Sequence, residues 1–164
     1  KTEELIRRLR RAQIARQRVK IFKPRCDARY ATHQIVSHDD QKLDSELIDR
    51  AEEIVTAIDA ETQVVGIDEA QFFGLELVQV CEDLADSGRR VIVAGLDQDY
   101  RGRPFEPIPQ LLAVAEYITK NLAICVVCGN PANRSQRITR EKERIVIGAF
   151  EHYEARCRRC FHSD

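Results

Sequence analysis

Two kinds of hydrophobic pattern alternate along this 164-residue chain. Apolar residues three and four positions apart predict helices, and the segments with this spacing are residues 1–18, 43–62, 75–88 and 108–117. Short, nearly continuous apolar runs predict buried strands at residues 19–24, 64–68, 89–97 and 117–125. Helices that alternate with such strands indicate an α/β fold, in which helices cover both faces of a parallel sheet.

The charge balance changes this picture little. The sequence has 26 Lys and Arg against 27 Asp and Glu, a formal net charge of −1, so no strong field draws in nucleic acid or an anionic membrane. The apolar runs are too short to span a bilayer, and no signal-peptide pattern is present. We therefore expect a cytoplasmic protein with no nucleic-acid and no membrane partner.

The first residues are Lys1 and Thr2, and the sequence contains no Met. We therefore expect the natural protein to include a segment before Lys1. A Lys-Thr pair that opens a helix matches the end of the phosphate-binding motif G-x-x-x-x-G-K-[ST], in which the Lys contacts phosphate and the hydroxyl binds magnesium. Alone, the pair favours an ordinary helix start over a phosphate-binding motif.

Two adjacent carboxylates, Asp68 and Glu69, follow the apolar run "VVGI". Ligands of parallel sheets bind beyond the carboxyl ends of the strands, where we also expect Asp97. P-loop enzymes hold their metal with an Asp at such a position, which makes a P-loop phosphotransferase the favoured interpretation. Glu69 can then accept a proton from a hydroxyl or a water, although it could also be a solvated residue at a strand end.

Cysteine spacing is the strongest local signal in the sequence. Four of the six Cys form two C-x-x-C units, "CVVC" (Cys125, Cys128) and "CRRC" (Cys157, Cys160). Four thiolates close a tetrahedral shell around one zinc ion and leave no open position, which is typical of a structural site. A redox pair or buried free thiols are the alternatives. We predict a domain boundary near residue 123, which gives domains 1–123 and 124–164.

Several other residues have both a structural and a functional interpretation. Phe72 and Phe73 could be core residues or a stacking surface for a planar base, and Tyr100 and Phe105 could extend that surface. Arg29, after the first strand, could contact phosphate or lie on the surface.

Taken together, the motifs resemble the type II thymidine kinases. The matching stretches include "FKPRCDARY", "GIDEAQFF", "VIVAGLDQDYRGRPF", "CVVCGNPANRSQR" and "GAFEHYEARCRRC", and they keep the family's order over nearly the whole chain. The resemblance implies a RecA-like P-loop sheet flanked by helices, followed by a small zinc-ribbon domain that carries a substrate-binding "lasso" loop.

The resemblance also implies a role for individual residues. Glu69 corresponds to the catalytic base, Asp68 to the magnesium-associated acid, and Lys1, Thr2 and Arg29 to the groups that bind ATP. The residues that correspond to the thymidine site are Phe72, Leu96, Tyr100, Phe105, Ser135, Val146, Ile147, Gly148 and Tyr153.

The expected activity is transfer of the γ-phosphoryl group of ATP, bound with Mg²⁺, to the 5′-hydroxyl of thymidine or deoxyuridine, in nucleotide salvage for DNA synthesis. Relatives are usually homotetramers that thymidine triphosphate (dTTP) inhibits, and structural Zn²⁺ is the second expected metal. Two other interpretations remain open. One is a P-loop ATPase whose zinc ribbon binds nucleic acid, and the other is a non-catalytic, zinc-stabilised interaction module.

Overall fold

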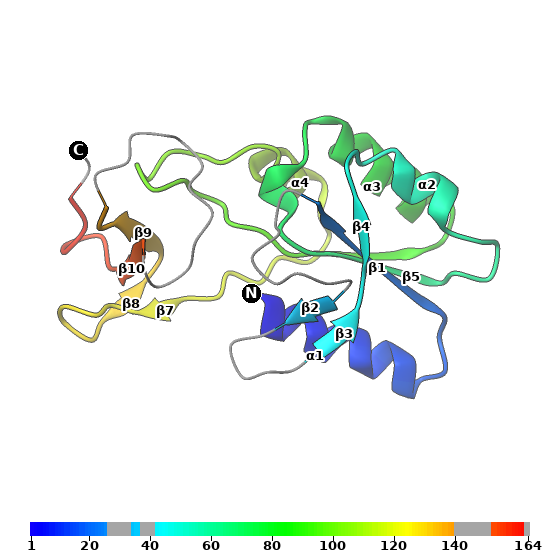
Figure 1. Cartoon of the computed structure of the whole chain (residues 1–164), viewed down its shortest axis with the longest axis horizontal. Helices are drawn as coiled ribbons and strands as arrows, with labels where there is room; N and C mark the ends of the chain where they lie inside the picture. The colour runs from blue at the N-terminus through cyan, green and yellow to red at the C-terminus, as the bar shows by residue number, and fades with distance from the viewer. Residues whose placement is uncertain (26–33, 37–41, 140–151, 163–164) are drawn as a thin grey trace. The chain divides into compact units, whose positions relative to one another are not determined.

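The computed structural model describes residues 1–25, 34–36, 42–139 and 152–162, and it divides the chain into two compact units (Figure 1). The first unit contains residues Lys1–Leu96 and Glu106–Val114. The second unit contains Asp97–Phe105 and Ala115–Asp164. The domain boundary near residue 123 stays a prediction.

A parallel sheet with four described strands forms the centre of the first unit, in the order β4 (Glu46–Ile48), β1 (Val19–Pro24), β5 (Val64–Ile67) and β6 (Arg90–Val93). In the register of these strands, Phe22 is paired with Ile67 and Ile67 with Val93, so the carboxyl ends of β1, β5 and β6 lie at one edge. Strands β2 (Gln34–Val36) and β3 (Lys42–Asp44) form a separate antiparallel pair. The predicted α/β fold with a parallel sheet is confirmed.

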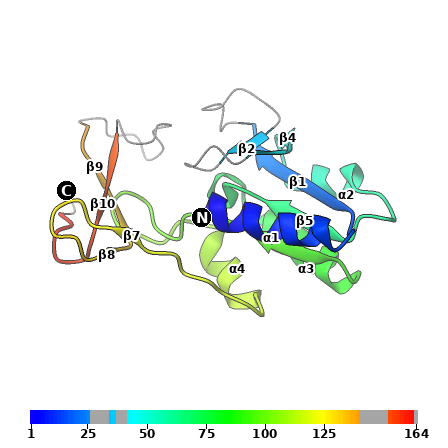
Figure 2. The ribbon, with the colours of Figure 1, turned by 90° about the horizontal axis from the view of Figure 1, so that it is seen from below.

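Helices cover both faces of this sheet (Figure 2). Helix α1 (Thr2–Ile14) buries Leu5, Ile6 and Leu9 against one face. The opposite face is covered by α2 (Glu53–Ala57), α3 (Glu76–Asp86) and α4 (Ile108–Val114), whose buried residues form a second apolar cluster with the sheet. A Cβ at Gly66 in β5 would lie 2.8 Å from Leu9, so the sheet accepts α1 this closely only because that residue is glycine.

The helix predicted over residues 43–62 is wrong in its first half. Leu47 and Ile48 lie on the strand β4, which pairs with β1, and only Glu53–Ala57 form α2. The apolar spacing fits a helix, but pairing with β1 buries Ile48 and decides the structure.

The fourth predicted strand, residues 117–125, is also wrong for most of its length. Only Ala123–Ile124 form a strand, β7, and it pairs antiparallel with β8 (Pro131–Ala132) outside the parallel sheet. Other elements are shorter than predicted, including α4, which ends at Val114. Helix α1 ends at Ile14, just before Arg16 enters a left-handed turn, and β6 ends at Val93.

The second unit has little apolar core among its described residues. Its strands form two antiparallel pairs, β7 with β8 and β9 (Arg134–Arg137) with β10 (Tyr153–Arg156). The buried cluster consists of Cys125, Ala132 and Cys157. Such a small cluster cannot by itself offset the entropy of ordering the unit.

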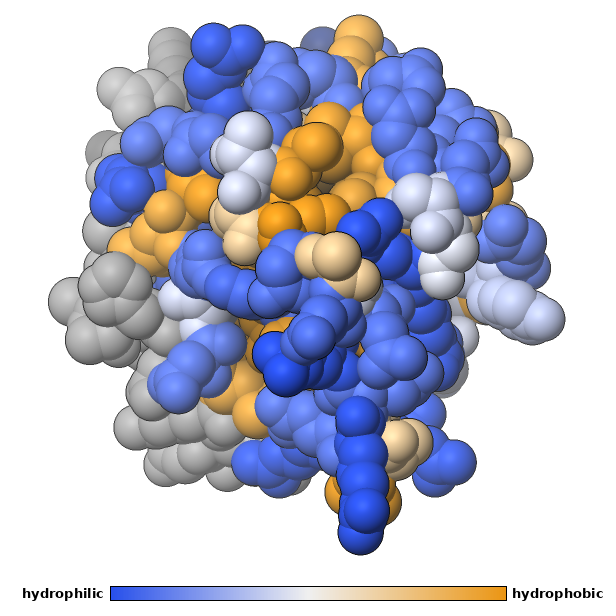
Figure 3. All heavy atoms as spheres, turned by 90° about the vertical axis from the view of Figure 1, so that its right-hand side faces the viewer, coloured by the Kyte–Doolittle hydropathy of each residue, from blue (hydrophilic) through white to orange (hydrophobic). Residues whose placement is uncertain are grey.

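The face shown in Figure 3 is predominantly hydrophilic. On the face shown in Figure 3, hydrophilic residues surround a central group of exposed hydrophobic side chains. In the part of the chain that the structure describes, no helix has the length and hydrophobicity needed to cross a membrane.

Candidate active site

The acidic pair lies at the carboxyl end of β5. The N–H of Asp68 donates a hydrogen bond of 3.0 Å to the carbonyl of Phe22 in β1, and the N–H of Ala70 donates one of 3.0 Å to the carbonyl of Ala94 just after β6. The backbone around the two carboxylates is therefore anchored to both neighbouring strands. Asp68 itself is buried, with 3% of its surface exposed.

Helix α1 begins at the same edge of the sheet. The Thr2 hydroxyl donates to the Asp68 carboxylate, with 3.0 Å between Oγ1 and Oδ2, and the Lys1 ammonium forms an ion pair with the Glu69 carboxylate. The four residues that the sequence analysis connected as a phosphate and metal site are thus brought together by the fold.

The electrostatics of this edge favour a cation. Burial raises the pKa of Asp68, the Lys1 ammonium opposes that rise, and the neighbouring Glu69 carboxylate adds to it. Burial makes the ionised forms of adjacent carboxylates costly unless a cation accompanies them. Carboxylate and hydroxyl oxygens are the ligands that Mg²⁺ prefers, so Asp68 and Thr2 fit a magnesium ion.

Glu69 is held in an unusual backbone conformation, with φ 51° and ψ 40°. For a residue with a Cβ, this left-handed region is strained and tends to persist where function requires it. The conformation begins the short 3₁₀ helix η1 (Ala70–Phe72), which turns the chain directly after the acidic pair. It gives Glu69 an orientation that regular strand geometry would not provide.

Gln71 is a residue that the sequence analysis missed. Its buried side chain accepts a 3.0 Å hydrogen bond at Oε1 from the Leu96 N–H and donates one of 2.6 Å from Nε2 to the Glu69 carboxylate. Because a backbone N–H can only donate, the amide oxygen must face Leu96 and the amide N–H must face Glu69. The only sequence signal was its place two residues after Glu69.

The residues predicted to bind thymidine are divided between the two units. Phe72 is half-buried in η1, and Leu96 is 38% exposed at the end of the main segment of the first unit. Tyr100, Phe105, Ser135 and Tyr153 belong to the second unit. There, Ser135 lies on β9 opposite Ala155, and Phe105 is buried.

Tyr100 and Tyr153 are connected through Arg137. The guanidinium carbon of Arg137 lies 3.5 Å from the centre of the Tyr100 ring, and its Nη2 donates a 2.7 Å hydrogen bond to the Tyr153 hydroxyl. The sequence analysis did not single out Arg137, because its significance depends on a contact between residues 37 positions apart.

Some predicted residues cannot be placed in this site. Arg29, Val146, Ile147 and Gly148 lie outside the described residues, as does Cys26. Asp97 belongs to the second unit, where its carboxylate forms an ion pair with Lys120.

The four cysteines of the two C-x-x-C units converge as predicted. The sulfurs of Cys125, Cys128, Cys157 and Cys160 all lie within 4.8 Å of one another, and those of Cys128 and Cys157 are 3.6 Å apart. Four sulfurs at ~2.3 Å from one zinc ion are separated by about 3.8 Å. The cluster is therefore positioned to bind a metal ion, and its donor set fits zinc.

The thiols of this cluster differ in acidity. Burial raises the pKa of Cys125, but backbone hydrogen bonds from Cys157, Val127 and Cys128 outweigh burial and lower the pKa to about 6. The pKa of Cys160 is raised to about 12, chiefly by its hydrogen bonds with Cys128 and Cys157. The cluster on its own therefore does not release all four protons, whereas a bound cation favours four thiolates.

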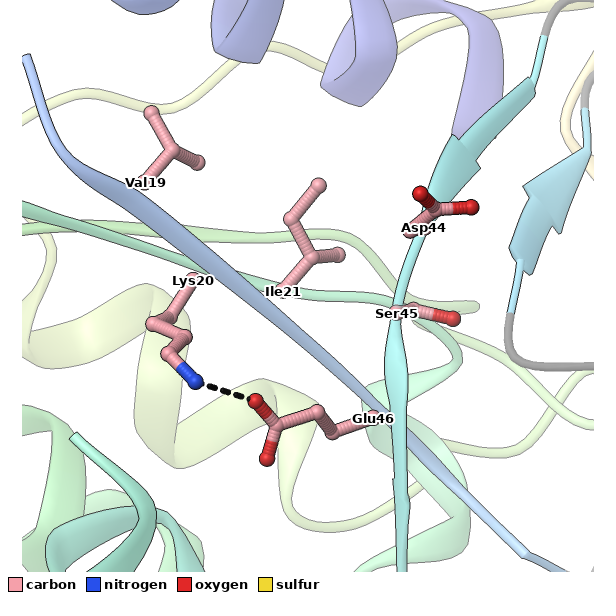
Figure 4. A pocket seen from close by; sticks show the side chains of 6 residues that line it. All are labelled: Val19, Lys20, Ile21, Asp44, Ser45 and Glu46. Atoms are coloured by element: carbon pink, nitrogen blue, oxygen red, sulfur yellow. Dashed lines mark hydrogen bonds and ion pairs between the residues drawn. The ribbon is translucent and has the colours of Figure 1, made fainter.

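A cavity of about 320 Å³ lies elsewhere in the first unit (Figure 4). It is lined by Val19, Lys20, Ile21, Asp44, Ser45 and Glu46. The space exists because β4 begins pairing with β1 only at Phe22 and leaves the start of β1 uncovered on that side. Lys20 and Glu46 neutralise each other across it, and it contains none of the predicted site residues.

Comparison with known proteins agrees with this arrangement. The profile of the thymidine kinase family matches residues 1–161. A thymidine kinase of Rhodothermus sp. (strain ITI 518) is 65% identical over 161 residues, which cover 98% of this chain and 75% of the relative. A thymidine kinase of Bdellovibrio bacteriovorus is 55% identical over 161 residues, 98% of this chain and 79% of that protein. The chain belongs to the thymidine kinase family.

Proposed function

We propose that this protein is an ATP-dependent thymidine kinase. It transfers the γ-phosphoryl group of ATP to the 5′-hydroxyl of thymidine, and also of deoxyuridine, as a salvage step that supplies nucleotides for DNA synthesis. The observation that carries the proposal is the meeting of Lys1 and Thr2, at the start of α1, with Asp68 and Glu69, at the end of β5. Membership of the thymidine kinase family supports it.

In this proposal the adjacent carboxylates have different tasks. Asp68 and Thr2 would hold the magnesium ion that accompanies ATP, which would neutralise charge on the phosphates. Lys1 exchanges its ion pair with Glu69 for contacts with the outer phosphates of ATP. Arg29 provides a second positive charge at the same phosphates. Glu69 accepts the proton of the 5′-hydroxyl while the oxygen bonds to the γ-phosphorus and the bond to the ADP oxygen breaks.

Gln71 has a supporting task in the same step. Its N–H group holds the Glu69 carboxylate in one orientation, while Leu96 holds Gln71 from the other side. Since a catalytic base must be positioned within hydrogen-bond reach of the proton it removes, this support contributes to the rate of transfer.

The nucleoside site in the proposal consists of an aromatic surface and a loop. Phe72, Leu96, Tyr100, Phe105 and Tyr153 are the residues that the family resemblance assigns to binding of the base. The family resemblance adds Ser135, on β9, together with Val146, Ile147 and Gly148, from the lasso loop between the two C-x-x-C units. The zinc cluster stabilises the unit that carries the two strands flanking this loop. A pocket of this kind accepts a pyrimidine and excludes the larger purines by shape.

The proposal extends to assembly and regulation, by analogy with the family. It includes a homotetramer, inhibition by dTTP, and a cytoplasmic location, where reducing conditions preserve the metal-binding thiols.

The test is to incubate the natural full-length protein with ATP, Mg²⁺ and a panel of nucleosides, and to separate the 5′-monophosphates by chromatography. Selective conversion of thymidine and deoxyuridine is the expected result. If no nucleoside is phosphorylated but DNA or RNA stimulates ATP hydrolysis, the kinase proposal is wrong and a nucleic-acid-dependent ATPase replaces it. Binding of zinc without turnover of ATP would instead indicate a non-catalytic module.

A further inference from the structure

Arg137 is a buried cation that two aromatic rings surround. It is the last residue of β9 and lies opposite Tyr153, the first residue of β10, in the antiparallel register. Its guanidinium carbon lies 3.5 Å from the centre of the Tyr100 ring and 5.3 Å from that of the Tyr153 ring. Both distances are within the ~6 Å range of a cation–π interaction, and Nη2 also donates to the Tyr153 hydroxyl at 2.7 Å.

The burial of this side chain needs an explanation. Only 6% of the surface of Arg137 is exposed, although arginine is among the residues least often buried. Removing a guanidinium from water is costly unless specific partners compensate. The partners here come from two segments far apart in the sequence, so Arg137 links the segment Asp97–Phe105 to the β9–β10 pair.

The segment that carries Tyr100 is itself well ordered. The buried carboxylate of Asp99 accepts hydrogen bonds of 2.9 Å from the N–H of Arg101 and 3.0 Å from the N–H of Arg103. The Arg101 side chain donates to the Tyr100 hydroxyl at 2.8 Å. Asp99 and Arg101 thus shape the turn around Tyr100, whereas Arg137 connects that turn to the neighbouring strands.

We propose that Arg137 is a positioning residue of the nucleoside site. It holds the rings of Tyr100 and Tyr153 in one fixed arrangement and so prepares two walls of the base pocket before the nucleoside binds. Arg137 takes no part in phosphoryl transfer. This inference rests on the proposed function, because it requires both tyrosines to bind the base.

The chemistry predicts a specific kinetic signature. Without Arg137 the rings lose a preformed arrangement, and the nucleoside must order them on binding, which weakens its affinity. Loss of a desolvated cation–π interaction together with one hydrogen bond should raise KM for thymidine roughly tenfold. Because the ATP site and Glu69 belong to the first unit, KM for ATP and kcat should change by less than about threefold.

Steady-state kinetics of the full-length enzyme with Arg137→Met and Arg137→Lys test this inference. Arg137→Met keeps roughly the length of the side chain. It removes the guanidinium, and with it the contacts with the two rings and the hydrogen bond to Tyr153. Arg137→Lys keeps the charge, and its KM should lie between those of the wild type and Arg137→Met. Arg156→Met is the matched control. The Arg156 guanidinium pairs with Glu154 on the same strand, β10, so its removal leaves the contacts of Arg137 with Tyr100 and Tyr153 in place. The KM of this variant for thymidine should stay within about twofold of the wild type.

Tyr153→Phe provides a test that preserves the fold if Arg137→Met does not. It removes the hydroxyl that accepts from Arg137 and keeps the ring, so we expect a rise of about two- to threefold in KM for thymidine. Zinc content and Tm, measured on every variant, identify any that has lost the metal or unfolded.

Three results would overturn the inference. The first is an unchanged KM for thymidine in folded, zinc-containing Arg137→Met. The second is an equal rise in KM for ATP and thymidine that parallels a loss of Tm, which would assign Arg137 a purely structural role. The third is an equal effect of Arg156→Met. A wild-type enzyme that does not phosphorylate thymidine would instead overturn the proposed function, so the two failures are distinguishable.

Discussion

The two units of this protein hold their functional groups in different ways. In the first unit, the acidic pair is anchored to a parallel sheet with a continuous apolar cluster on each face. In the second, the described apolar cluster is small, consisting of Cys125, Ala132, Cys157 and the side chains packed on them, and four thiols converge at that place. Hydrophobic burial can therefore stabilise the first unit, whereas in the second a metal ion at the four thiols can supply stability that the small cluster does not.

This difference has a functional counterpart in the proposed reaction. Phosphoryl transfer requires carboxylates and an ammonium at fixed positions, and a packed sheet provides that rigidity. Binding of a nucleoside requires strands and loops that surround the base, and a metal can hold their ends together without a large core. Substitutions in each unit can test whether the sheet stabilises the first unit and a metal ion the second.

Removal of one metal ligand should have the largest effect. Cys157→Ser should lower the zinc content from one ion per chain to nearly none, because three thiolates bind zinc much more weakly than four. Structural zinc contributes on the order of 10 kcal/mol to the folding of small domains. The second unit should therefore lose its amide-exchange protection and KM for thymidine should rise, while the first unit keeps its protection.

The matched control for this change is Cys81→Ala. Cys81 is buried in the first unit, and burial raises the pKa of its thiol to about 12, so it should not bind metal. Metal analysis measures the zinc content of both variants, and hydrogen exchange measures the amide protection of each unit. An unchanged zinc content in Cys157→Ser would contradict the metal site.

Replacement of the proposed base should have the next largest effect. Glu69→Gln keeps the size of the side chain and removes its ability to accept a proton, so kcat for thymidine phosphorylation should fall by about 10²–10⁴-fold. Binding of nucleotide should persist, and KM for thymidine should change little.

Glu82→Gln serves as the control, since Glu82 is exposed on α3. Initial rates of thymidine monophosphate formation measure the effect. Turnover near the wild-type level in Glu69→Gln would rule out Glu69 as the base.

The apolar core of the first unit should respond to truncation independently of zinc. Leu77 is fully buried in α3, so Leu77→Ala should lower the free energy of unfolding of the first unit by about 2–5 kcal/mol, through lost burial and a cavity. Urea denaturation measures this change, and zinc content should stay at the wild-type level. Leu75→Ala, at a position 53% exposed, should cost far less. Equal losses in the two variants would contradict the assignment of stability to this core.

Loss of the support for Glu69 should have a smaller effect. Gln71→Leu removes the donor to the Glu69 carboxylate and leaves the Leu96 N–H without its acceptor, so kcat should fall by roughly tenfold. Gln79→Leu, at an exposed position on α3, should leave kcat unchanged. If Gln71→Leu raises KM for thymidine and leaves kcat intact, Gln71 supports the pocket rather than the base.

The smallest effect concerns a surface ion-pair network on α1. Hydrogen bonds from Arg7 and Arg8 lower the pKa of Glu4 to about 2 from its ordinary value of 4.5. Because the pKa is lower in the folded state, the stabilisation is present above pH 4.5 and disappears as the pH falls toward 2. Glu4→Gln should therefore cost about 0.5–1 kcal/mol at pH 7, and the difference from the wild type should vanish near pH 2. Glu3→Gln is the control, and a difference that does not depend on pH would contradict this explanation.

Much of the candidate site was predictable because its signals are local. A C-x-x-C unit brings two thiols together within four residues, and two such units suffice to predict a four-thiol cluster. An acidic residue directly after a buried parallel strand must lie at the edge of the sheet where ligands bind, so Asp68 and Glu69 could be located from the strand alone. The helices α3 and α4 were predictable for a similar reason, since their apolar spacing is regular.

Other features depend on contacts between distant parts of the chain. Residues 47 and 48 have the spacing of a helix, but β1 offers them hydrogen-bond partners and a buried face, and a strand results. The orientation of Gln71 depends on Leu96, 25 positions away, and the burial of Arg137 depends on Tyr100. Nothing in the local sequence distinguishes these two side chains from ordinary surface residues.

Local sequence features were thus enough to indicate the type of chemistry: a pair of carboxylates after a buried strand, a Lys-Thr pair before a helix, and four thiols with the spacing of a metal site. Tertiary structure alone decided which of these groups meet, as when the Thr2 hydroxyl reaches Asp68 across 66 residues. The physical reason is that periodicity and spacing describe interactions within an element, whereas strand pairing and side-chain burial depend on which elements pack together.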